Sequence, residues 1–88
     1  MDTRAAVVRV LREADEPLHW TVIQDRALRA GYLDPFEIAD IRRAVLTALG
    51  ELVREGAVAK AGTGVYRPIA EGRAEGRAGG RGGNPTDG

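Results

Sequence analysis

Four residues in the middle of the chain share one side of a helix wound at 100° per residue, opposite its apolar side: Arg43, Thr47, Gly50 and Arg54. Arginine can grip phosphate or read guanine with its forked guanidinium, and threonine can donate to phosphate or contact a thymine methyl. A glycine costs about 1 kcal/mol relative to alanine in a helix interior, and a backbone that must lie close to another molecule would explain it. These four residues form a polar stripe that predicts nucleic-acid binding. The alternative is that the stripe is an ordinary solvated helix face.

Further polar residues surround this stripe. Arg42 lies at the edge of the apolar arc, early in the helix, where recognition helices contact DNA. Arg26 and Arg29, on an earlier predicted helix, could clamp backbone phosphate, although Asp25 partly offsets their charge. A predicted β-ribbon after the long helix adds three more candidates: Lys60, Thr63 and Arg67. Such residues can reach phosphate or the minor groove, or they can simply protect an edge strand from pairing with another sheet.

The stripe must be positioned by a long helix that ends at a glycine. We predict that this helix begins at Asp34 as its N-cap, with Pro35 at the first helical position and Glu37 completing a capping box. If the helix breaks near residue 39, Asp40 could serve as a second cap. Gly56 stands where a left-handed C-terminal cap is needed. The apolar face is formed by residues at helical spacing: Ile38, Ile41, Val45, Leu49 and Leu52.

Shorter elements flank this helix. Residues 3–14 predict a first helix with a stripe of Ala5, Val8 and Leu11 that is widened by Val7 and Ala14. Residues 18–20 predict a short strand that could pair with the ribbon. A second helix is expected to start at Thr21, with Gln24 in a capping box, and to stop at residue 31. Tyr32 and Leu33 should then fill the space between the second and third helices. Strands at 57–60 and 65–67, joined by a 62–64 turn, complete the ribbon.

The order of elements is therefore helix, short strand, helix, helix and a two-stranded β wing. This order predicts an α+β fold, a small winged helix-turn-helix domain over residues 1–69. Residues 70–88 differ in composition: Glu-Gly-Arg-Ala occurs twice, and no apolar residue larger than alanine follows Ile69. Such a segment cannot bury enough surface to offset its chain entropy, so we expect a disordered Gly/Arg-rich tail. Similar tails touch nucleic acid loosely, but the acids cancel the arginines here, which favours a neutral flexible tail.

Charge and composition limit the possible functions. The 88 residues hold 13 basic and 13 acidic side chains, and the pI is 6.6. Because a strongly basic balance is absent, any nucleic-acid binding must come from local clustering of arginines. There is no cysteine, which fits a reducing compartment. The chain shows neither an apolar signal segment nor a run long enough to span a bilayer, so we expect a cytoplasmic protein without a membrane partner.

Catalysis and metal binding are not expected. His19 is the only histidine, and no carboxylate cluster accompanies it to form a metal site. No hydroxyl has a base placed by sequence to activate it except Thr21 beside His19, and Thr21 is better used as a cap. Trp20 and Tyr66 have apolar neighbours and are expected in the core. We therefore predict a protein that is not an enzyme and needs no cofactor.

Two blocks of residues resemble a known family. Leu18-His19-Trp20-Thr21, followed by Ile23, Arg26-Ala27-Leu28 and Gly31-Tyr32-Leu33, resembles the first signature of HARE winged-helix domains, and 62–66 resembles their closing wing motif. The resemblance covers roughly residues 4–68. It implies a small module that binds nucleic acid or attaches to a DNA-bound machine, such as a restriction endonuclease, a DNA repair enzyme, a chromatin regulator or bacterial RNA polymerase. The chain departs from the family in lacking a Thr-Pro start to the third helix and in having no catalytic partner domain.

Two hypotheses follow. In the first, the protein binds double-stranded DNA, with the third helix in the major groove and the wing on the flanking backbone, as an accessory factor in transcription or DNA metabolism. In the second, it is a protein-interaction module that docks on RNA polymerase or another DNA-bound protein. An apolar strip of Ala39, Leu46 and Val53 would then be the contact, or the seam of a homodimer rather than a monomer. We favour the first.

Overall fold

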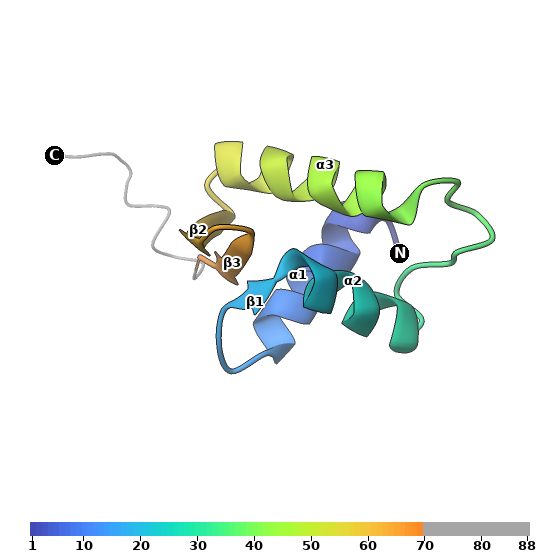
Figure 1. The fold of residues 1–88 in the computed structure, drawn as a ribbon, viewed down its shortest axis with the longest axis horizontal. Helices are drawn as coiled ribbons and strands as arrows, with labels where there is room; N and C mark the ends of the chain where they lie inside the picture. The colour runs from blue at the N-terminus through green and yellow to red at the C-terminus, as the bar shows by residue number, and fades with distance from the viewer. Residues whose placement is uncertain (70–88) are drawn as a thin grey trace, which may run out of the picture.

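The computed structural model describes residues 1–69. They form three α-helices and one three-stranded antiparallel sheet, in the order α1 (Thr3–Glu13), β1 (Leu18–His19), α2 (Trp20–Arg29), α3 (Ile41–Arg54), β2 (Val58–Gly62) and β3 (Val65–Pro68). Helix α3 runs along one side of the molecule, α1 and α2 pack against it, and the sheet closes one end (Figure 1). The small α+β class is confirmed, and the layout is compatible with a winged helix. The predicted tail, 70–88, lies outside the described residues.

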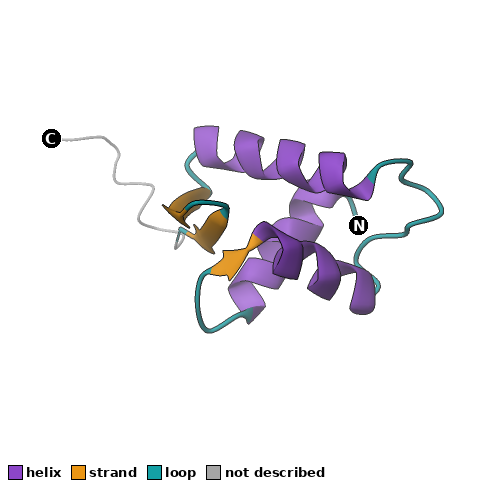
Figure 2. Cartoon of the chain, viewed as in Figure 1, coloured by secondary structure: helices purple, strands orange, loops and turns teal. Residues whose placement is uncertain are grey.

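The sheet joins the short first strand to the later hairpin. Its strand order is β1-β3-β2, and β1 pairs with β3 through Leu18↔Tyr66 and His19↔Val65. Figure 2 shows these strands together, with α2 leaving directly from β1. The predicted pairing of the short strand with the ribbon is therefore confirmed. The β2–β3 turn relies on Gly64, whose φ of 71° is in the left-handed region that favours glycine.

The core receives side chains from all three helices and all three strands. Its largest fully buried side chains include Leu11, Ile23, Leu49 and Val58. On α1 the buried residues are Ala6, Val7, Val10 and Leu11. The predicted α1 stripe was partly wrong, since Ala5 is exposed and Val8 is only half-buried. Val7 and Leu11 are buried as predicted, but α1 packs against α2, α3 and β3 together, so its buried face is rotated away from Ala5 and Val8 and includes Ala6 and Val10.

The predicted start of the long helix at Asp34 is wrong. Helix α3 begins after Asp40, whose side chain accepts a hydrogen bond from the Arg43 N–H at 3.0 Å. Asp34 is used locally instead: its Oδ1 accepts from the Phe36 N–H at 2.9 Å, and its carbonyl accepts from the Glu37 N–H at 3.0 Å. These are the hydrogen bonds of an N-cap, but the turn that they start ends at residue 37, and residues 38–40 are not helical. The second cap considered from the sequence is the one the fold uses.

The residues that follow α2 are divided between two tasks. Leu33 is buried in the core, as predicted. Tyr32 is half-buried and packs against the core, and its hydroxyl donates to both Glu13 carboxylate oxygens on α1, at 3.0 and 2.8 Å. Its ring also lies 5.1 Å from the Arg9 guanidinium. Tyr32 therefore ties the end of α2 to α1.

Helix α2 also starts differently from the prediction. Its N-cap is His19, whose Nδ1 accepts from the Thr21 N–H at 3.3 Å, so Thr21 is not the cap. Gln24 does not complete a capping box, since its Oε1 is buried and has no hydrogen-bond partner within residues 1–69. The Trp20 N–H donates to the Gly64 carbonyl at 2.9 Å. The cap therefore lies two residues before the expected one, and the Trp20–Gly64 bond anchors the hairpin turn to the start of α2.

Candidate nucleic-acid interface

One long side of α3 faces solvent, and we call Arg43, Thr47, Gly50 and Arg54 its outer face. Arg43, Thr47 and Arg54 are exposed and Gly50 is half-buried. The opposite side carries the buried residues Val45, Ala48, Leu49 and Leu52. Within the described part of the chain, neither arginine side chain of the outer face has a hydrogen bond or an ion pair. Two guanidinium groups and one hydroxyl are thus presented together to solvent.

Gly50 is not required by packing within the protein. A Cβ placed on Gly50 would lie 3.6 Å from the Arg54 Nη1, which is ordinary van der Waals contact with the end of a flexible side chain. Gly50 also does not have a positive φ. The glycine therefore leaves the α3 backbone open to close approach by another molecule, and nothing in the protein itself requires it.

Arg42 is held at the edge of this face by an aromatic ring. Its guanidinium carbon lies 5.5 Å from the centre of the Trp20 ring, within the range of a cation–π interaction. The Trp20 ring is half-buried against the core, and its centre is 5.7 Å from that of His19. Trp20 therefore does pack against the core as predicted, and it also positions Arg42. Sequence spacing gave no sign of this contact, because 22 positions separate the two residues.

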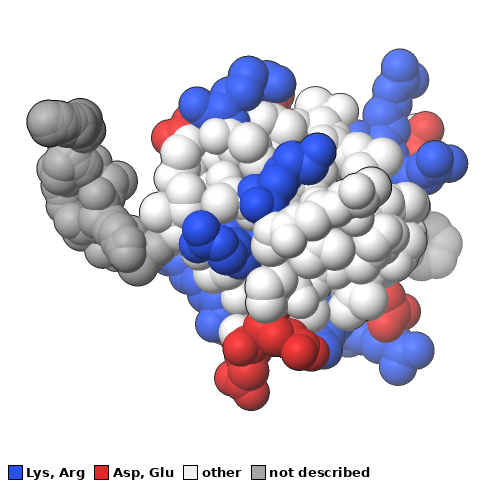
Figure 3. All heavy atoms as spheres, turned by 60° about the vertical axis from the view of Figure 1, so that its left-hand side comes forward, with Lys and Arg blue, Asp and Glu red and all other residues white. Residues whose placement is uncertain are grey.

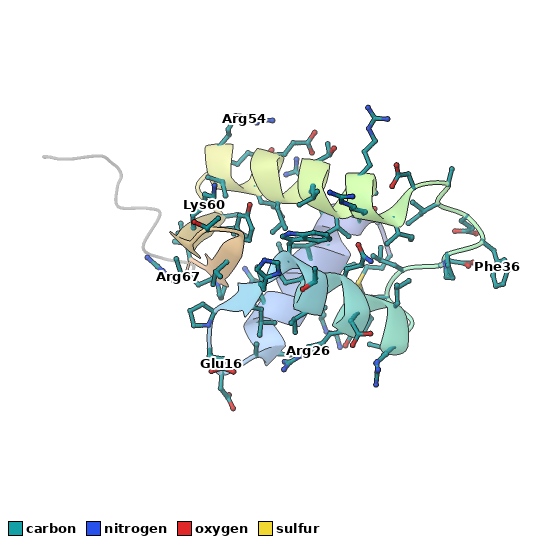
Figure 4. All side chains as sticks on the ribbon, in the orientation of Figure 1. Glu16, Arg26, Phe36, Arg54, Lys60 and Arg67 are labelled. Atoms are coloured by element: carbon teal, nitrogen blue, oxygen red, sulfur yellow. The ribbon has the colours of Figure 1, made fainter. Side chains whose placement is uncertain are left out.

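The β2–β3 hairpin extends the basic surface beyond the end of α3. Lys60, Thr63 and Arg67 are all exposed. Figure 4 shows Lys60 and Arg67 on the hairpin at the same end of the molecule as Arg54. Figure 3, which brings this end forward, shows basic side chains spread over a largely uncharged face, with the acidic side chains mostly at its edges. The structure thus brings Arg54 to the same end as the hairpin candidates, whereas Arg42 and Arg43 lie at the other, N-terminal end of α3.

The hairpin is fixed in place by close packing at its turn. A Cβ on Gly64 would lie 2.9 Å from the His19 Nε2 and 3.3 Å from the Trp20 Cδ1. Real Cβ atoms essentially never come within 3.0 Å of another heavy atom, so a side chain here would force His19 to shift, and the φ of 71° also favours glycine. This contact, with the Trp20 N–H bond to the same residue, sets the hairpin relative to α2.

Arg26 and Arg29 are not brought to this surface. They line a shallow hollow with Val10 and Glu13 of α1, and Figure 4 shows Arg26 on the side of α2 away from α3. Arg29 also pairs with Asp25, with its Nε 3.0 Å from the carboxylate. These two candidates therefore form a separate group.

The acids of α3 lie on its other edge and are held by the first helix. Arg4 donates from Nη1 to Glu55 at 2.7 Å and to Glu51 at 3.4 Å, and from Nη2 again to Glu55. These hydrogen bonds lower the pKa of the Glu55 carboxyl, and the charges of Arg4 and Arg54 lower it further, while desolvation opposes them. The sequence showed Glu51 beside the outer face but could not show Arg4, because the contact joins the two ends of the domain.

Within residues 1–69 no group of three or more His, Cys, Asp and Glu side chains is placed to hold a metal ion. In the same residues no helix is both long and apolar enough to cross a bilayer. Comparisons with protein families, curated proteins and solved structures find no match. The resemblance to HARE domains therefore stays a prediction that depends on the residues quoted for it.

Proposed function

We propose that this chain is a winged-helix protein that binds double-stranded DNA. Helix α3 would enter the major groove, and the β2–β3 hairpin would serve as the wing on the flanking backbone, as in an accessory factor of transcription or DNA metabolism. The observation that carries the proposal is the separation of charge along residues 41–68. This segment has five basic and two acidic side chains, and both acids are bound to Arg4. One further acid, the capping residue Asp40, lies beside Arg42 and Arg43, so the basic residues remain in excess. The net neutrality of the chain therefore does not extend to this surface.

The geometry suits groove binding in two ways. Exposed arginines and a threonine on one helix face can reach both phosphates and base edges. Arg42, supported by Trp20, needs less ordering on binding than a free surface arginine, because part of its rotamer entropy is already lost. About 4–6 phosphate contacts would give a slope of log affinity against log salt of about −4 to −5.

The test is fluorescence anisotropy on a random-sequence duplex at two salt concentrations. We expect Arg42→Glu with Arg43→Glu to abolish measurable binding. Arg26→Glu with Arg29→Glu is the matched control, since it changes the formal charge equally on α2, away from the α3 face. It should weaken binding much less. Equal loss in both double variants would mean attraction by charge alone, and an unchanged affinity in the first would refute docking through α3.

The alternative is docking on RNA polymerase or another DNA-bound protein through an apolar strip on α3. The structure does not form that strip as predicted. Ala39 lies in the connection before α3, and Val53 packs against the core. Only Leu46 of the predicted strip then stands apart from the core, beside Arg42 and Arg43. These three positions therefore do not form a continuous apolar surface on α3 for a partner or a homodimer.

A further inference from the structure

The connection between α2 and α3 exposes the largest apolar side chain on the described surface. Phe36 is 97% exposed. Figure 4 shows it at the tip of the connection, at the opposite end of the molecule from Lys60 and Arg67. A single surface apolar residue is ordinary, so its setting decides whether it has a role.

The backbone around Phe36 is held in a defined turn. The Phe36 N–H donates to Asp34 Oδ1 at 2.9 Å, and the Glu37 N–H donates to the Asp34 carbonyl at 3.0 Å. Pro35 between them has a restricted φ. The phenyl ring is therefore presented from an ordered loop, so a partner that binds it has little backbone entropy to remove.

The surface around this turn is acidic. Residues 31–40 contain Asp34, Glu37 and Asp40 and no Lys or Arg. A shallow hollow of about 280 Å³ adjoins the turn, lined by Asp2, Asp34, Glu37 and the apolar side chains of Met1 and Ile38. The three carboxylates that line this hollow repel phosphate, so the hollow does not suit DNA. An apolar pocket with a basic rim does suit it.

We propose that this turn, residues 34–37, is a docking site for a protein partner, with Phe36 inserted into an apolar pocket rimmed by Lys and Arg side chains. Aromatic side chains that enter such pockets commonly dominate the affinity of an interface. The site lies at the opposite end of the molecule from the hairpin and from Arg54 (Figure 4), so one chain could bind a protein there and a duplex through those residues. This inference goes beyond DNA binding and does not depend on it.

The experiment places a photo-crosslinking residue, p-benzoylphenylalanine, at Phe36 of the full chain in cells of the source organism. The control places it at Val22 on α2, which is 37% exposed and, after Met1 and Phe36, the remaining exposed large apolar residue of the described part. We expect one protein adduct from position 36 that position 22 does not give. The trapped protein is then purified and titrated with the unmodified chain.

In that titration we expect Phe36→Ser to weaken binding at least 10-fold. Asp34→Asn with Glu37→Gln, or added salt, should weaken it about 3-fold or more. Phe36→Ser should leave thermal unfolding and duplex affinity unchanged, which separates this site from the α3 surface. The proposal is overturned if position 36 gives no adduct, if its adduct is a second copy of this chain, or if Phe36→Ser binds the trapped protein as tightly as before.

Discussion

The two edges of α3 carry opposite charges, and only one edge is neutralised inside the protein. Towards α1, Glu51 and Glu55 are bound by Arg4. Towards solvent and the hairpin, Arg43 and Arg54 have no ion pair within the described residues, and Arg42 lies over Trp20. Since Arg4 comes from a distant part of the chain, tertiary packing converts a helix of mixed sequence charge into one with a basic free surface. A chain with a net charge of zero can therefore have a basic surface on one side.

The largest effect on duplex affinity is expected from removing the arginines of the edge that faces solvent. We expect Arg43→Ala with Arg54→Ala to weaken duplex binding about 100-fold, since each arginine contact is worth about 1–3 kcal/mol when it reads a base. The thermal unfolding midpoint should stay nearly the same. Anisotropy and differential scanning calorimetry measure the two quantities.

The matched change on the other edge is Glu51→Gln with Glu55→Gln. It should lower the unfolding midpoint, because Arg4 loses its partners, while duplex affinity stays the same or rises slightly. If the glutamine variant weakened DNA binding as much as the alanine variant, the distinction between the two edges would be wrong.

The next largest effect on duplex affinity is expected from displacing the hairpin, whose position depends on Gly64. Gly64→Ala puts a Cβ 2.9 Å from His19 Nε2 at a φ of 71°. We expect it to destabilise the domain by about 1–2 kcal/mol, the cost of a left-handed residue, and to displace Lys60 and Arg67. Urea unfolding measures the first effect and duplex affinity the second.

Gly62→Ala is the control in the same hairpin. Its Cβ would meet Val65 at 3.7 Å, an ordinary contact, so stability and DNA binding should both be nearly unchanged. Equal destabilisation by the two substitutions would show that the His19 contact does not decide the hairpin's position.

Gly50→Ala should act in opposite directions on stability and binding. The free protein has room for the methyl group, 3.6 Å from Arg54 Nη1, so helix propensity should stabilise it by up to about 1 kcal/mol. If α3 lies close to DNA at this position, duplex affinity should fall several-fold. Urea unfolding and anisotropy on the same preparation test both signs. A variant that is more stable and binds equally well would remove Gly50 from the interface.

Local patterns predicted more of this fold than of its surface. Helical spacing gave the buried side of α3, and Gly56 ends that helix with a φ of 82° as expected. The start of α3 was harder, because Asp34 and Asp40 are both good capping residues and only the hydrogen bonds of the folded chain separate them. The α1 face, the His19 cap and the contacts of Arg42 and Arg4 depend on which elements pack together. Spacing alone does not contain that information.

The smallest expected effect concerns pH and the edge of α3 that faces α1. Arg4 holds the pKa of Glu55 below its usual value, and the Tyr32 hydroxyl and Arg9 hold that of Glu13 below its own. A carboxyl whose pKa is lower in the folded state contributes stability above its unfolded pKa, and that contribution is lost as pH falls through the folded pKa.

We therefore expect the free energy of unfolding to decrease as pH falls below about 4.5, and Glu55→Gln to make the decrease shallower. Glu16→Gln is the control, an exposed acid with no partner within residues 1–69, and it should leave the slope unchanged. Urea unfolding across this pH range measures how the free energy of unfolding depends on pH. Because Arg4 and Glu55 are both partly exposed, high salt should reduce the difference in slope between the original protein and Glu55→Gln. Identical slopes in all three proteins would mean that Arg4 does not neutralise Glu55 in solution, and α3 would then present acids as freely as arginines.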